Sequence, residues 1–179
     1  AFEAVSRSQG NLVGVNMVQA EDGIISMRDY QQQMRVFNYL HAQYPNVHIA
    51  LHAGELTADY VAEKELTYHI QDALMIGKAQ RIGHGIDIKH ESKETINYMA
   101  QHNIPVEINL VSNQHILNIA ARKHPLNYYL AHQVPVVLST DDEGILRTNL
   151  TQQYVKAVLE HHLEYSTLRQ INRNTLTYA

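Results

Sequence analysis

The sequence predicts an α/β fold with a parallel sheet, and the spacing of apolar residues is the main reason. Short apolar or β-branched runs alternate with longer segments in which apolar residues recur every three or four positions. The runs are nearly continuous, as expected for strands that are buried on both faces. Five strands fit a doubly wound open sheet, or part of a (β/α)8 barrel, which needs about 250 residues. Periodicity leaves both architectures open.

Five runs are expected to form the strands of this sheet. In chain order they are Asn11–Val18, Val47–His52, Ala79–Ile82, Pro105–Leu110 and Val134–Ser139. The chain has no internal repeat, low-complexity tract or linker-like stretch. Residues 1–179 are therefore expected to belong to one domain, and 179 residues are enough for a hydrophobic core.

Helical periodicity fills the segments between and after these runs. It is strongest from Met27 to Tyr44, where Ser26 and Asp29 resemble a capping box. Weaker repeats predict further helices, namely Leu66–Leu74, Ile96–Ala100, His124–Leu130, Leu150–Leu159 and Leu168–Leu176. Ser92 and Ser166 are expected to cap two of them.

Composition excludes several classes of protein. The hydrophobic content of 45% with 18% charged residues is typical of a folded domain, and the net charge is only −4. Lys and Arg are scattered, so we expect no nucleic-acid partner. No apolar run approaches the ~18 residues of a membrane span. The chain has no cysteine, which excludes disulfides and leaves the compartment open.

Polar residues follow four of the five runs, at the edge where parallel strands place their functional groups. They are His52 with Glu55, His84, Ser112 with Asn113, and Asp141 with Asp142. Each alone has an ordinary explanation, such as a turn, a helix cap or a hydrogen-bonded histidine. Together, histidines and carboxylates on separate strand ends favour metal-assisted hydrolysis, with Zn²⁺ as the metal and a nearby Glu or His to move protons.

Three motifs carry a resemblance to a known family. The sequences "HAGE", "RIGHG" and "STDD", in this order and spacing, resemble the signatures of the adenosine/AMP deaminase family. Similarity continues through "HIQDALMIGKAQRIGHG", "EINLVSN" and "HPLNYYLAHQVPVVLSTDDEG". The segment "LVGVNMVQAEDG" and the helix before "RIGHG" resemble the adenosine deaminase-related growth factor branch and its bacterial relatives. That branch is often exported, which favours export slightly over the cytoplasm.

The resemblance implies a fold and a role for each motif residue. The family fold is a (β/α)8 barrel, and this chain corresponds to about its fourth to eighth strands. His52 and Asp141 match zinc ligands. Glu55 matches the acid that protonates purine N1, and His84 the histidine that orients the attacking water. Asp142 matches the residue that hydrogen-bonds purine N7. The implied reaction converts adenosine to inosine and ammonia.

Two departures from the family pattern affect this expectation. The family has two further zinc ligands in a His-x-His motif on its first strand, and the chain has no such pair. It also begins at Ala1, so we expect a C-terminal portion whose N-terminal half is absent or is a cleaved companion chain. Open strand edges then favour association with that half or a second copy. Gln19 stands where relatives have a glycine that contacts the purine.

The leading hypothesis is zinc-dependent deamination of adenosine or a related aminopurine nucleoside, with this chain supplying the C-terminal half of the site. The nearest alternative substrates are AMP and a modified adenine nucleoside. A different class of alternative is a catalytically incomplete fragment with a structural or binding role. Metal content separates the catalytic alternative from the non-catalytic one.

Overall fold

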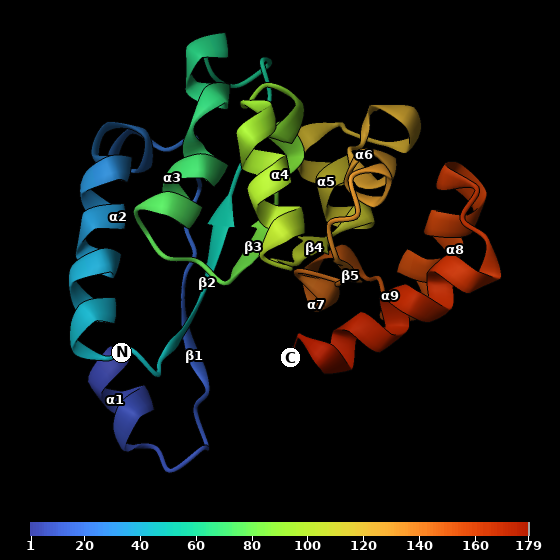
Figure 1. The fold of residues 1–179 in the computed structure, drawn as a ribbon. Helices are drawn as coiled ribbons and strands as arrows, with labels where there is room; N and C mark the ends of the chain where they lie inside the picture. The colour runs from blue at the N-terminus through green and yellow to red at the C-terminus, as the bar shows by residue number, and fades with distance from the viewer. Residues whose placement is uncertain (179) are drawn as a thin grey trace.

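The computed structural model describes residues 1–178, which form a curved five-stranded sheet flanked by helices (Figure 1). The strands are β1 (Gly14–Met17), β2 (His48–Ala53), β3 (Arg81–His84), β4 (Val106–Ile108) and β5 (Val136–Leu138). All pairs are parallel, as the sequence predicted, and the strand order is β1-β2-β3-β4-β5. A doubly wound sheet reverses its order at a switch point. The sequential order among these strands is that of part of a (β/α)8 barrel.

The register between strands divides the sheet into a helix-facing side and an opposite side. Leu51, Ile82, Val106 and Val136 pair in one row across four strands, and each is at most 1% exposed. Successive side chains of a strand point to opposite faces. The next row, which starts with His52, therefore points to the opposite side of the sheet.

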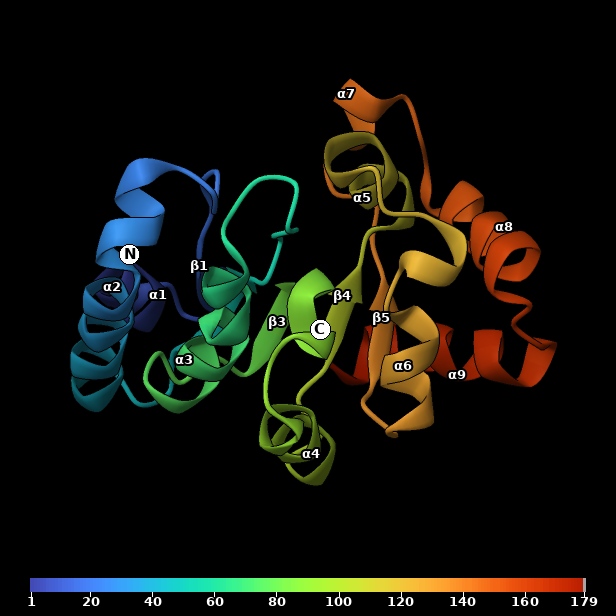
Figure 2. The same ribbon diagram turned by 90° about the horizontal axis from the view of Figure 1, so that it is seen from above.

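The helices follow the strands in the expected alternation. They are α1 (Phe2–Arg7), α2 (Ile24–Gln43), α3 (His69–Met75), α4 (Lys93–Gln101), α5 (Leu110–Leu117), α6 (Leu126–Ala131), α7 (Glu143–Leu146), α8 (Leu150–His161) and α9 (Tyr165–Thr177). Short 3-10 helices lie at Glu63–Thr67, Ile86–Lys89 and Ala121–Lys123. Seen from above, α2, α3, α4 and α6 lie along one face of the sheet, and α5 and α7 lie towards the other (Figure 2).

The predicted capping box at the start of α2 is wrong. Gly23 is the N-cap, and Ser26 lies inside the first turn of the helix. The Ser26 hydroxyl donates to the carbonyl of Ala20 at 2.6 Å, which ties the helix to the preceding loop. Asp29 pairs with Arg28, at the surface, instead of capping a backbone amide. The Ser26 side chain therefore bonds to the loop after β1 instead of capping α2 as the sequence predicted.

Other boundaries differ from the sequence expectation by a few residues. Ser92 is the N-cap of α4, as predicted, whereas α9 is capped by Glu164, so Ser166 lies within it. Strand β3 extends to His84 instead of ending at Ile82. The expected strand ending at Leu110 stops earlier, because α5 begins at that residue.

The core lies between the sheet and the helices. Tyr30 and Met34 of α2 are 3% and 0% exposed, and both belong to the main hydrophobic cluster. Glycine at position 77 keeps space for Met34, because a Cβ there would lie 2.7 Å from its sulfur. Within residues 1–178, every helix is too short or too polar to cross a membrane.

Replacing Met34 by alanine should destabilise the fold strongly. The side chain is fully buried, so its loss leaves a cavity, and the expected cost is about 2–5 kcal/mol. Arg35→Ala, at an exposed position of the same helix, should change stability by less than about 0.5 kcal/mol. Urea unfolding of the two variants measures the difference. Equal midpoints would contradict the packing of α2 against the sheet.

Candidate metal centre and active site

The carboxyl ends of three strands bring two histidines and an aspartate together. His52 lies near the end of β2, His84 ends β3, and Asp141 follows β5. One ligand-type atom of each lies within 4.8 Å of the others. The His52 and His84 rings are centred 4.8 Å apart. Imidazole nitrogen and carboxylate oxygen are preferred ligands of Zn²⁺, so this donor set fits a zinc ion.

The backbone is strained where it presents two of these residues. His84 has φ +68° and Asp141 has φ +57°, a left-handed conformation that costs a non-glycine residue about 1–3 kcal/mol. Strict alternation along β3 would send His84 to the helix side, with Ile82. The left-handed turn redirects its ring towards His52. Next to it, a Cβ at Gly85 would lie 2.2 Å from the hydroxyl of Tyr129, so the turn requires glycine.

Glu55 and His84 form an acid–base pair beside this cluster. Glu55 Oε1 lies 3.2 Å from His84 Nδ1, and the side chains are 16% and 1% exposed. Burial, followed by the charges of Asp141 and Glu21, raises the pKa of Glu55 to about 8. Burial, followed by His52, lowers the pKa of His84 to about 4. At neutral pH the pair is a protonated carboxyl beside a neutral imidazole, a proton donor beside an acceptor.

A chain of buried hydrogen bonds holds the His84 ring from behind. The backbone N–H of Leu126 donates to His124 Nδ1 at 3.1 Å, which leaves the His124 proton on Nε2. That nitrogen lies 3.1 Å from Asn113 Oδ1, so it donates there and turns the Asn113 amide nitrogen towards His84. The amide nitrogen lies 3.0 Å from His84 Nδ1. The chain of contacts therefore fixes the orientation of the His84 ring.

Asp141 and Asp142 occupy different places after β5. The hydroxyl of Ser112, in α5, donates to Asp141 Oδ2 at 2.6 Å, which orients the carboxylate. Asp142 is the N-cap residue of α7 and lies in the wall of the same pocket. Gln19, in the loop after β1, also lies in that wall. Six of the eight residues singled out from the sequence therefore border one cavity, and Ser112 and Asn113 do not.

The cavity is a strongly acidic pocket of about 530 Å³. Its carboxylates are those of Glu21, Asp22, Glu55, Asp141 and Asp142. Among the described residues, no Lys or Arg lines it. Tyr60, Ile116 and Leu117 supply an apolar side, and the Tyr60 hydroxyl donates to the Ile116 carbonyl at 2.9 Å. The pocket suits an uncharged ligand with hydrogen-bond donors.

Sequence reasoning missed several residues of this site. Glu21 was given no role, although a carboxylate shortly after a predicted strand is the signal that drew attention to Glu55. Ser112 and Asn113 were noted at a strand end without a function. His124 was considered only as part of a helix start. His124 and His84 are 40 residues apart along the chain, so the contact between them through Asn113 depends on the fold.

Comparisons with known proteins show the family to which the chain belongs. A family model described as adenosine deaminase matches residues 2–179. An adenosine deaminase from Klebsiella pneumoniae is 32% identical over 133 residues, 74% of this chain and 37% of the relative. One from Vibrio cholerae is 28% identical over 179 residues, 99% of this chain and 49% of the relative. The chain thus spans at most about half the length of these relatives.

Solved structures show the same fold. The crystal structure of an adenine deaminase from Arthrobacter aurescens matches with a TM-score of 0.77 at 17% identity, covering 99% of this chain and 50% of that one. An amidohydrolase from Burkholderia ambifaria with bound zinc matches with a TM-score of 0.76 at 15% identity, covering 99% and 46%.

The fold and the pocket define an α/β protein built like part of a (β/α)8 barrel, with its polar groups at the carboxyl ends of parallel strands. Within that class, the chain belongs to the adenosine deaminase family. The resemblance carried by the three sequence motifs is thereby confirmed.

Acid should destabilise the protein partly through His124. Burial lowers its pKa from 6.5 to about 3, so between these values the unfolded state binds more protons. The free energy of unfolding therefore falls as the pH falls from 6.5 towards 3. His124→Gln removes this dependence, so its stability deficit relative to the parent should shrink between pH 7.5 and pH 5. Urea unfolding at both pH values measures the deficit, and a constant deficit would contradict a buried neutral His124.

Proposed function

We propose that the chain supplies the C-terminal half of the active site of a zinc-dependent deaminase that converts adenosine, or a related aminopurine nucleoside, to inosine and ammonia. One observation carries the proposal. The protonated Glu55 lies 3.2 Å from the neutral His84, beside the ligand-type atoms of His52 and Asp141, in a single pocket. Membership of the adenosine deaminase family supports the same reaction.

Each residue has a separate task in this proposal. His52 and Asp141 hold the zinc ion. A zinc ion supplies Lewis acidity, which lowers the pKa of a coordinated water to near neutral. Glu55 gives its proton to N1 of the purine ring as water adds at C6. His84 orients the water and takes up its proton, and Asp142 hydrogen-bonds N7. The amino group then leaves as ammonia with the proton that His84 took up, and the proton of the new C6 hydroxyl restores Glu55 as C6=O forms.

The charge of the pocket favours a nucleoside over a nucleotide. Besides the protonated Glu55, four acidic side chains line it and, within residues 1–178, no Lys or Arg does, so a 5′-phosphate meets repulsion on this side. AMP remains the alternative if the other half of the barrel supplies cations. Gln19 narrows the wall where relatives have glycine, which favours testing adenosine beside modified adenine nucleosides.

A complete site requires ligands beyond the two that this chain supplies, His52 and Asp141. A catalytic zinc takes three protein ligands and keeps one position for water. In the proposal, the remaining ligands come from the N-terminal half of the same protein, as one chain or as a cleaved companion. Exposed apolar residues near β1, such as Val13 at 67% and Val18 at 65%, offer surface for that half. A non-catalytic fragment with a binding role is the second candidate, because the ligand set here is partial.

Conversion of adenosine to inosine, followed by ultraviolet absorbance, tests the proposal. The chain with its N-terminal half and zinc should convert adenosine, and the chain alone should not. Inactivity of the completed protein on adenosine, AMP and methylated adenosine would contradict the proposed function and favour the binding role.

Glu55→Gln should lower turnover by several orders of magnitude without loss of the metal. The amide cannot give a proton to N1, and loss of a general acid typically costs about 10²–10⁴-fold in kcat. Zinc content, measured by atomic absorption, should match that of the parent. Near-normal turnover would exclude Glu55 as the proton donor.

Asp141→Ala should lose zinc and activity together, because it removes one of the metal ligands. Asp142→Asn is the matched control, because the proposal gives this neighbouring side chain a contact with the substrate and none with the metal. It should keep full zinc occupancy and show a raised KM for adenosine. Full zinc occupancy in Asp141→Ala would contradict the assignment of Asp141 as a ligand.

A further inference from the structure

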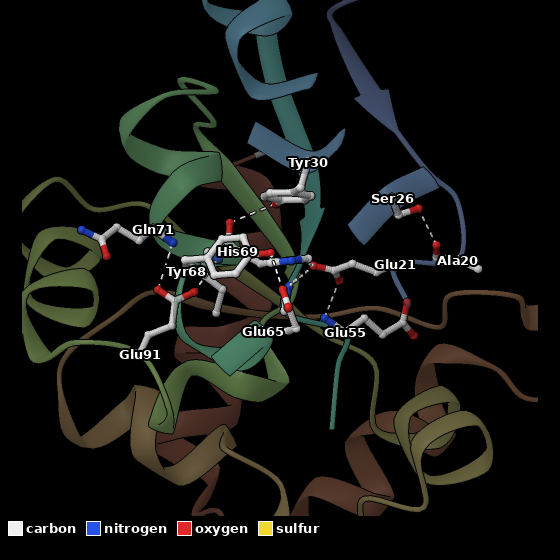
Figure 3. A network of polar contacts seen from close by, with 12 residues as sticks. Ala20, Glu21, Ser26, Tyr30, Glu55, Glu65, Tyr68, His69, Gln71 and Glu91 are labelled. Carbon is white, nitrogen blue, oxygen red and sulfur yellow. Dashed lines mark hydrogen bonds and ion pairs between the residues drawn. The ribbon is translucent and has the colours of Figure 1, made fainter. Parts of the chain in front are cut away.

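Glu21 binds the backbone of the loop that carries Glu55 (Figure 3). It lies in the loop between β1 and α2 and is 6% exposed. The N–H of Gly54 donates to Glu21 Oε1 at 2.8 Å, and the N–H of Glu55 donates to Oε2 at 2.7 Å. Both carboxylate oxygens therefore hold consecutive amides of the "HAGE" motif.

The backbone of this loop is shaped to receive an anion. Gly54 has φ +75°, and a left-handed residue turns successive N–H groups towards one point, as in anion-binding nests. A Cβ at Gly54 would lie 2.2 Å from Asp87 Oδ1, so only glycine fits. The carboxylate of Glu21 occupies the point on which the two amides converge.

His69 holds Glu21 from the other side. Its Nδ1 lies 2.5 Å from Glu21 Oε1, and the His69 side chain is completely buried. The ring stacks on Tyr30, with centroids 3.9 Å apart and planes 14° apart. The Tyr30 hydroxyl donates to the His69 carbonyl at 2.9 Å. Glu21 is thus fixed by three donors on elements that pack in the core.

We propose that Glu21 and His69 are a positioning pair that aims the Glu55 carboxyl at His84 by fixing the Glu55 backbone. The inference rests on the proposed function, in which Glu55 protonates the substrate. Glu21 acts through the amides of Gly54 and Glu55. Loss of the contacts between Glu21 and these amides should therefore lower the rate of the chemical step more than it weakens substrate binding.

Glu91 offers a matched control for a purely structural role. Its Oε1 accepts from the N–H of Ile70 at 2.6 Å, and its Oε2 from that of Gln71 at 2.9 Å. It is 8% exposed, similar to Glu21. Its two amides open α3 instead of belonging to the "HAGE" loop. Glu91→Gln therefore removes an equivalent acceptor pair that does not hold Glu55.

The first test compares Glu21→Gln with Glu91→Gln in the completed, zinc-loaded protein. A glutamine places an N–H₂ donor where the carboxylate accepts, so one contact to the loop is lost. Glu21→Gln should lower kcat by about 100-fold, the cost of a misplacement near 1 Å, with little change in KM. Glu91→Gln should keep the parent kcat. Equal kcat in both variants, or a loss confined to KM, would overturn the proposal.

The second test does not depend on deaminase activity. Amide hydrogen exchange should show Gly54 and Glu55 exchanging at least about tenfold faster in Glu21→Gln, because local opening becomes easier. In Glu91→Gln, Ile70 and Gln71 should change instead. Unchanged protection of Gly54 and Glu55 would overturn the proposal that Glu21 holds these two amides. If Gly54 and Glu55 exchange faster in Glu21→Gln but the parent protein deaminates no purine, the contact of Glu21 with the two amides stands. Only the function on which its catalytic role rests is then refuted.

His69→Phe provides a second variant that keeps an aromatic ring against Tyr30. It removes the Nδ1 contact while Glu21 retains both backbone amides. It should lower kcat by an intermediate factor of about 10, and Gly54 should exchange faster than in the parent. A kcat equal to that of the parent would remove His69 from the positioning pair.

Discussion

The parallel register between β2 and β3 is the constraint on which the site depends. It pairs Leu51 with Ile82 in the core, and so places His52 opposite Gly83 on the other side of the sheet. A Cβ at Gly83 would lie 3.6 Å from His52, an ordinary contact, so the two residues are direct neighbours across the sheet. A slip of one residue would exchange the two faces of a strand. The burial that stabilises the sheet therefore also determines which polar groups meet.

Electrostatics give these polar groups different protonation states. Glu55 and His84 share one buried site, yet burial raises the pKa of the acid and lowers that of the histidine. Both neutral forms are favoured, because each avoids a desolvated charge. The surrounding carboxylates, with Glu21 and Asp141 foremost, add to the effect at Glu55. The site is thus prepared for proton transfer before any substrate enters.

Sequence predicted those features that depend on local pattern. The five parallel strands and most helices follow from apolar periodicity, and the motifs placed His52, His84 and Asp141 at strand ends. The N-cap of α2 was wrong because Ser26 bonds to the preceding loop, a contact that spacing does not reveal. Glu21 and His69 are 48 residues apart, so their contact depends on the fold. Helix α5 was missed because its first residue continues an apolar run.

The location of bound zinc would show directly whether His52 and Asp141 hold the metal. A diffraction map measured at the zinc absorption edge, from crystals of the completed protein, would show which side chains hold the ion. We expect a single peak coordinated by His52 Nδ1 or Nε2 and by a carboxylate oxygen of Asp141, with Glu55 and His84 facing it. A peak bound elsewhere, or coordinated by His84 in place of His52, would contradict the assignment of His52 and Asp141 as the ligands.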